Sequence, residues 1–159
     1  MFSNEPTLMN FDDFQIGIDT NILVYSLNSE SIYHEKAKEF INNLSKKRIL
    51  GVITWQNLSE LYAVATDKKR FPGFMAASQA VTVIKNLLGN KNIKLILPTT
   101  STGKTFFDLI MKNKPKGQKI HDIFLSATLL SNGIHTLVTE NTKDFSGITN
   151  LKAETLNSF

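Results

Sequence analysis

The sequence predicts one α/β domain in which helices cover both faces of a mainly parallel sheet of four or five strands. Short apolar runs alternate with longer stretches of helical spacing along the chain, and this alternation is typical of a doubly wound α/β/α arrangement. A length of 159 residues fits a single domain with a sizeable core. We therefore expect a short N-terminal arm over residues 1–14 and one domain over residues 15–159.

The first half of the chain contains three apolar runs with helical spacing after each of the first two. The expected strands are residues 16–18, 49–53 and 93–97, and the expected helices are residues 20–27, 33–44, 55–66 and 75–88. The run at 49–53 is continuously apolar, which is typical of a parallel strand that is covered on both faces. Residues Ala37, Phe40 and Leu44 recur at helical spacing between charged residues, which predicts a surface helix on the sheet.

The second half repeats the same alternation. A short helix is expected at 105–112, a basic loop at 113–119, and an almost uncharged helix at 120–132 that Gly133 ends. Two further strands are expected, at 135–139 and at 151–156.

Composition narrows the functional classes. The chain has no cysteine, which excludes disulfides, thiolate metal sites and cysteine nucleophiles and is compatible with a cytoplasmic location. No segment approaches the roughly 18 apolar residues of a membrane span, so we expect a soluble protein without a membrane partner. The net charge of +4 comes from 16 Lys and 2 Arg against 14 acids, a surplus that suits a polyanionic partner without requiring one.

Four acidic residues stand out because each is expected near the C-terminal edge of the predicted sheet. Asp19 directly follows the first strand, and Glu60 is the one charged residue of the helix at 55–66. Asp122 begins an uncharged stretch, and Asp144 follows the fourth strand. Because open α/β sheets hold their ligands at the carboxyl ends of the strands, we expect the four carboxylates near that edge.

Each acid taken singly also has a structural explanation. Asp19 and Asp122 are suitable helix N-caps, worth about 1 kcal/mol each, and Glu60 or Asp144 can pair with a nearby lysine. Taken together, carboxylates at one edge repel by roughly 4 kcal/mol per pair at 4 Å with an effective dielectric near 20. A cation must offset this, and Mg²⁺ or Mn²⁺ suits such oxygen donors. We expect Asp19 within metal-bridging distance of Asp122 and Asp144, with Glu60 close by.

Four short motifs carry a resemblance to one nuclease family. They are Asp19-Thr20-Asn21 after a strand, Glu60 within Asn57-Leu58-Ser59-Glu60-Leu61, Asp122 in Ile120-His121-Asp122 ahead of Ser126-Ala127-Thr128, and a last motif with Thr139, Asn141, Asp144 and Phe145. In this order and spacing the motifs resemble those of the PIN-domain nucleases, in particular the VapC-type toxins of toxin–antitoxin pairs. The resemblance extends over residues 16–156 and implies a PIN-like sandwich.

The resemblance implies a metal-dependent endoribonuclease. It assigns metal binding and catalysis to Asp19, Glu60, Asp122 and Asp144, and hydrogen-bonding support to Thr20, Asn21, Thr139 and Asn141. Such support is physically reasonable, since hydroxyls and amides orient carboxylates without adding charge. The cofactor is expected to be Mg²⁺ or Mn²⁺ and the substrate RNA, cut to leave a 5′-phosphate and a 3′-hydroxyl. The implied partners are a small antitoxin protein and a second copy of the chain.

Basic residues gather just ahead of Asp122. Lys114, Lys116 and Lys119 lie where they can draw RNA phosphates toward the metal, although a solvated loop has the same composition. The stretch 98–105 resembles an incomplete phosphate-binding loop. Pro98 replaces its first glycine and removes an amide donor, so nucleotide binding is not expected there.

Two other functions compete with the ribonuclease hypothesis. In the first, the chain is a non-catalytic PIN-like RNA-binding or scaffold module whose acids are caps and ion pairs. In the second, less favoured, it is a structure-specific DNA nuclease. Chelation of divalent ions separates the first alternative from the nuclease, and preference for branched or flapped DNA over RNA identifies the second.

Overall fold

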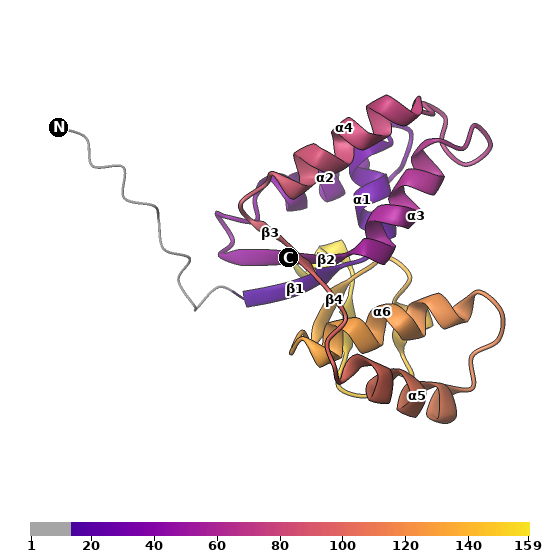
Figure 1. Cartoon of the computed structure of the whole chain (residues 1–159). Coiled ribbons are helices and arrows are strands. Elements are labelled where there is room, and N and C mark those ends of the chain that lie inside the picture. Colours follow the sequence, from indigo (N-terminus) through magenta and orange to yellow (C-terminus); the bar gives the residue numbers. More distant parts are fainter. Residues whose placement is uncertain (1–13) are drawn as a thin grey trace.

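A five-stranded parallel sheet forms the centre of the computed structural model, which describes residues 14–159 (Figure 1). Its strands are β1 Phe14–Ile18, β2 Ile49–Thr54, β3 Ile93–Ile96, β4 Thr136–Val138 and β5 Lys152–Glu154. The strand order is β3-β2-β1-β4-β5, and every neighbouring pair is parallel. The predicted fold class is confirmed. The part of the expected arm at residues 1–13 lies outside the described residues.

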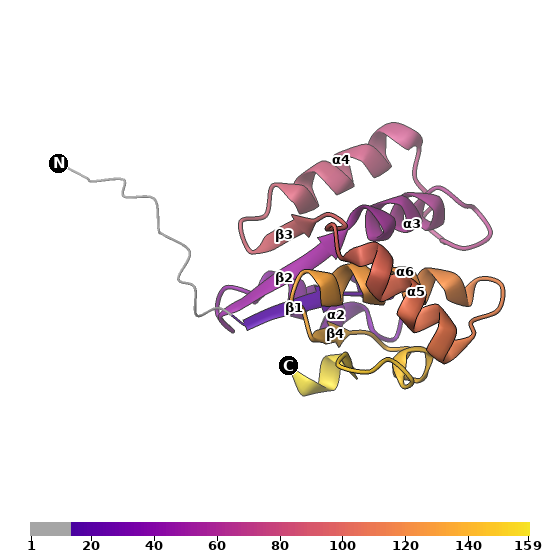
Figure 2. The same cartoon turned by 60° about the horizontal axis from the view of Figure 1, so that its bottom comes forward.

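Helices cover both faces of the sheet. Helices α1 Thr20–Leu27, α2 His34–Asn42, α3 Trp55–Ala65 and α4 Ala77–Leu88 lie on one face, and α5 Thr102–Asn113 and α6 Lys119–Ser131 lie on the other (Figure 1). Each face has its own buried apolar cluster, with Ile16 and Ile18 of β1 in the first and Leu137 of β4 in the second. Figure 2 shows β3 and the C-terminal segment at opposite edges of the sheet. Within residues 14–159, no helix has the length and apolar character needed to span a bilayer.

The element boundaries differ from the expected ones where local hydrogen bonds decide them. Strand β1 includes Phe14, ahead of the expected start at Ile16, and the Phe14 amide bonds the carbonyl of Arg48 ahead of β2 (3.1 Å). Helix α5 begins three residues earlier than expected, at Thr102, whose hydroxyl accepts the amide of Thr99 (2.8 Å). Two short 3₁₀ turns, η1 Thr142–Phe145 and η2 Leu156–Ser158, were not expected.

Gly17 lets β1 and α6 approach closely. A Cβ atom at this position would lie 2.8 Å from a methyl group of Leu129, which is completely buried. We expect Gly17→Ala to lower the free energy of unfolding by about 1–3 kcal/mol through overpacking, as measured by urea denaturation. In a Leu129→Ala background the same change should be much less harmful, and an equal penalty in both backgrounds would contradict this explanation.

Candidate active site

The carboxyl ends of β1 and β4 form the switch point of the sheet. From β1 the chain continues to β2 on one side, whereas β4 pairs with β1 on the other side. Asp19 follows β1 and Thr139 follows β4, and the Asp19 amide bonds the Val138 carbonyl (3.0 Å). Ligand sites of open α/β sheets lie in the crevice at such a point.

Asp19 is held by two hydrogen bonds. Its Oδ1 accepts the Thr20 amide (2.7 Å), so the residue does cap α1, and its Oδ2 accepts the Thr139 hydroxyl (2.7 Å). The Thr139 oxygen in turn accepts the side-chain amide of Asn21 and the backbone amide of Asn141, each at 3.0 Å. The structure thus brings all four predicted supporting residues to Asp19, although Thr20 and Asn141 contribute backbone amides here rather than side chains.

Glu60 is joined to the same cluster through Thr20. The Thr20 hydroxyl donates to Glu60 Oε2 (2.8 Å) and accepts the side-chain amide of Asn57 (3.1 Å). The Gln56 amide donates to Glu60 Oε1 (2.9 Å) and to the backbone carbonyl of His121 (3.0 Å), which ties α3 to the start of α6.

Sequence reasoning assigned no role to Gln56 and Asn57. Asn57 is buried, and its Oδ1 also accepts the backbone amide of Thr54 as part of a capping box (2.9 Å). Their spacing in the sequence could have indicated a role. The two amide side chains precede Glu60 by four and three residues, in the first turn of an otherwise apolar helix, and residues at this spacing are neighbours on a helix surface.

Asp122 and Asp144 come from the start of α6 and from η1. Asp122 lies in the first turn of α6 and is partly buried, whereas the Asp144 side chain is 38% exposed. Lys119 Nζ donates to Asp144 Oδ1 at 2.8 Å. The lysine that we expected to contact RNA therefore pairs with one of the four acids, as the structural explanation of Asp144 predicted. Lys114 and Lys116 are exposed between α5 and α6.

Burial and neighbouring charges raise the pKa of two of the acids, Asp19 and Asp122. Burial raises the pKa of Asp19 to about 6, with smaller contributions from the charges of Asp122 and Glu60, although the Thr139 and Thr20 hydrogen bonds oppose the shift. The pKa of Asp122 is raised by burial and by the charge of Asp144, while Lys119 acts in the opposite direction. The acids therefore share one electrostatic field that favours a bound proton or another cation.

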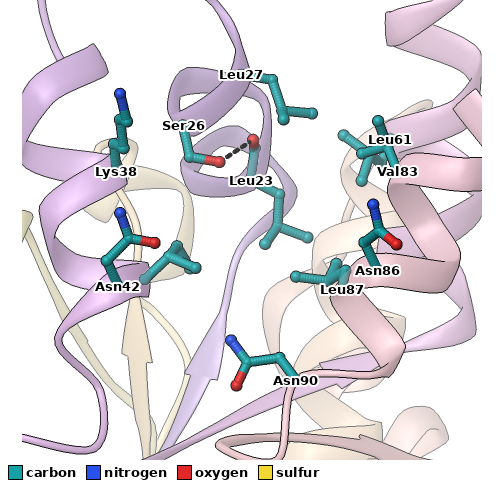
Figure 3. A pocket seen from close by; sticks show the side chains of 11 residues that line it. Leu23, Ser26, Leu27, Lys38, Asn42, Leu61, Val83, Asn86, Leu87 and Asn90 are labelled. Carbon is teal, nitrogen blue, oxygen red and sulfur yellow. Dashed lines mark hydrogen bonds between the residues drawn. The ribbon is translucent and has the colours of Figure 1, made fainter. Parts of the chain in front are cut away.

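Most of the predicted site residues line one hollow of about 400 Å³. Its lining includes Asp19, Thr20, Asn21, Glu60, Asp122 and Asn141, together with Arg70 from the loop after α3. Asp144 is not part of the lining, and sequence reasoning missed Arg70. A second hollow, of about 300 Å³, lies between α1, α2 and α4; it is floored by leucines and lined by no carboxylate (Figure 3). The acid-lined hollow is therefore the candidate active site.

The donor set fits a hard divalent cation, although it does not form a closed cage. Among residues 14–159, no three acidic or histidine side chains are arranged to hold one ion directly. In the same range, two buried side-chain oxygens lack a hydrogen-bond partner, Asn21 Oδ1 and Gln56 Oε1, and both belong to the acid cluster. Carboxylates of raised pKa beside unpartnered amide oxygens are suitable surroundings for Mg²⁺ or Mn²⁺ and its water ligands.

Comparison of the sequence with protein-family models and with curated proteins finds no match. Solved structures, in contrast, share the fold. VapBC-1 from nontypeable Haemophilus influenzae has a TM-score of 0.63 at 19% identity, over 90% of this chain and 98% of that one. VapBC2 from Rickettsia felis, bound to a DNA fragment from its promoter, has a TM-score of 0.62 at 24% identity, over 89% of this chain and 98% of that one. VapC20 from Mycobacterium tuberculosis, described as a sarcin–ricin loop cleaving toxin, has a TM-score of 0.60 at 14% identity, over 86% of this chain and 98% of that one.

Proposed function

Because the chain has the fold of the VapC PIN domains, we propose that it is a Mg²⁺- or Mn²⁺-dependent endoribonuclease that acts in the cytoplasm. The observation that carries the proposal is the meeting of Asp19, Glu60 and Asp122 in one hollow at the switch point of the sheet. Carboxylates gathered in this way suit a metal-assisted hydrolysis of phosphodiesters. The neighbour described as cleaving the sarcin–ricin loop favours RNA as the substrate.

The chain's own residues would prepare the site for the ion. Asp19 and Asp122 would hold it, and Asp144 would join them when Lys119 leaves its carboxylate. When bound, such an ion activates water and neutralises the phosphate. Thr139 and Thr20 keep the Asp19 and Glu60 carboxylates oriented through their hydroxyls, which is the usual task of residues behind metal ligands.

The proposed activity is tested by incubating the purified protein with RNA and Mg²⁺ and analysing the fragment ends. Attack by water is expected to leave a 5′-phosphate and a 3′-hydroxyl, whereas attack by the ribose 2′-hydroxyl leaves a cyclic phosphate. Cyclic-phosphate ends would overturn the proposed chemistry. RNA binding without cleavage would favour the scaffold alternative, and preferential cutting of flapped DNA at equal salt would favour the DNA nuclease.

We also propose that the chain is the toxin of a two-protein module and that the antitoxin occupies the hollow of Figure 3. Several structural neighbours are toxin–antitoxin complexes. The hollow has an apolar floor of Leu23, Leu27 and Leu87 and a polar rim that includes Lys38, a combination that suits an amphipathic helix laid in a groove. A homodimer, which the resemblance implies, stays a prediction that light scattering can test.

Leu87→Glu is expected to abolish capture of the antitoxin without changing RNA cleavage. Leu87 lines the apolar hollow and not the acid-lined one, and a buried unpaired carboxylate is strongly unfavourable in an apolar interface. The measurement is co-purification with the product of a small reading frame immediately upstream, compared with the exposed control Lys85→Glu. Equal capture by both variants would exclude this groove.

A further inference from the structure

The acid-lined hollow extends beyond the acids along α1 and α3. About one helical turn past Asp19 and Glu60, its wall becomes apolar, formed by Val24, Tyr25, Ala63 and Val64. The Tyr25 ring packs against Tyr33, with ring centroids 5.0 Å apart. On both helices, therefore, apolar residues with one aromatic side chain follow the acids along the lining, and on α3 they lie between Glu60 and the loop that follows the helix.

That loop presents Arg70 to the hollow on a well-anchored backbone. The amides of Arg70 and Phe71 donate to the carbonyl of Asp67 at 3.0 and 2.9 Å, and the Asp67 side chain accepts the Lys69 amide at 2.8 Å. Phe71 is buried, and the Met75 amide closes the loop on the Ala65 carbonyl (2.8 Å). The backbone position of Arg70 is thus determined by its neighbours on both sides.

The Arg70 charge is not engaged in holding the fold together. In the part of the chain that the structure describes, its guanidinium has no hydrogen bond or ion pair, and its side chain is exposed while lining the hollow. Lys119 provides the direct ion pair in the acid cluster, to Asp144. A cation that lines an anionic site without pairing to its acids is available for a second anion.

We propose that Arg70 binds a phosphate of single-stranded RNA next to the one that is cut, with the intervening nucleoside against the apolar wall. This inference rests on the proposed function and adds a phosphate-binding position to it. A guanidinium matches phosphate geometry with two parallel hydrogen bonds, and the Tyr25 face suits a base or ribose. The acids and Arg70 would then grip successive phosphates of one strand.

The test measures binding rather than cleavage. A short single-stranded RNA oligonucleotide is titrated against the Asp19→Asn protein at several salt concentrations by fluorescence anisotropy. Adding Arg70→Ala should lower the affinity about tenfold and reduce the slope of log affinity against log salt by about 0.7, the value for one phosphate contact on a single strand. Arg70→Lys should restore most of the slope. The matched control is Lys69→Ala, which removes the same charge from the same loop outside the hollow.

The position of the contact is tested with oligonucleotides that carry one neutral methylphosphonate linkage at successive sites. At one position in the series, the neutral linkage should weaken RNA binding by the protein that keeps Arg70. The same linkage should leave RNA binding by the Arg70→Ala protein unchanged. The inference is overturned if Arg70→Ala and Lys69→Ala have identical effects on RNA binding. It is also overturned if no linkage distinguishes the protein with Arg70 from the Arg70→Ala protein, even if the wild type cleaves RNA. An Arg70-dependent phosphate contact in a protein that never cleaves RNA would overturn the nuclease proposal alone.

Discussion

The substitution Asp19→Asn is expected to slow RNA cleavage strongly and, at the same time, to stabilise the fold at neutral pH. Asp19 directly follows β1, and its two carboxylate oxygens accept the Thr20 amide and the Thr139 hydroxyl. If Asp19 holds the proposed ion, loss of its charge should slow cleavage on the order of 100-fold or more, because such an ion contributes several kcal/mol to stabilising the transition state.

The stabilisation follows from the raised pKa of Asp19. Its carboxyl has an ordinary value of 3.8 and a folded value of about 6, so the folded chain binds more protons than the unfolded chain between these pH values. The wild type should therefore lose stability as the pH rises from about 4 to 6, by at most about 3 kcal/mol at about 1.4 kcal/mol per unit. Asp19→Asn should lack this loss and be more stable at pH 7 by about 1–2 kcal/mol, since imperfect hydrogen bonds offset part of the gain.

Urea denaturation between pH 4 and pH 8 measures this effect without any RNA. The control is Asp108→Asn, because Asp108 is exposed on α5 and pairs with Lys104, where a change should stay within about 0.5 kcal/mol. The same pH dependence in the wild type and in Asp19→Asn would show that the Asp19 carboxyl is not responsible for it.

Removal of divalent metal should have the second large effect. EDTA is expected to stop RNA cleavage, and added Mg²⁺ or Mn²⁺ to restore it. Without RNA, Mg²⁺ at about 100 times its dissociation constant should stabilise the folded chain by about 2.7 kcal/mol, which raises the melting temperature by roughly 5–10 °C for a domain of this size. The shift should be larger at pH 8 than at pH 5, because protons compete for the Asp19 carboxylate.

The matched variant for the metal experiment is Asp122→Asn, which removes an acid of the hollow. Its melting temperature should respond little to Mg²⁺, whereas Asp108→Asn should respond like the wild type. Cleavage that continues in EDTA, or an equal thermal shift in all three proteins, would contradict a metal bound by these acids.

Local patterns in the sequence were sufficient to predict the strands and helices that build this fold. The continuous apolar run of β2 and the spaced apolar residues of α2 correspond to the observed elements, with differences of a few residues at the ends. Those ends involve individual side chains, such as the Thr102 hydroxyl that accepts the Thr99 amide at the start of α5. A pattern averaged over many residues does not contain that information.

The acids of the site could be found for the same local reason. A carboxylate such as Glu60 in an otherwise uncharged helix is conspicuous in sequence, because burying an unpaired charge is unfavourable. The other residues of the hollow and its surroundings were not conspicuous. Gln56, Asn57 and Arg70 are ordinary residues in sequence, and their roles appear only when α1, α3 and α6 converge on one hollow.

The sequence by itself determined which segments are strands, which are helices, and which acids are out of place, because these properties depend on neighbours along the chain. Only the tertiary structure decided the strand order that puts β1 beside β4, the bond from Thr139 to Asp19 across 120 positions, and the pairing of Lys119 with Asp144. These contacts depend on how distant segments pack, and the free energy of that packing is shared by the whole core rather than held in any one motif.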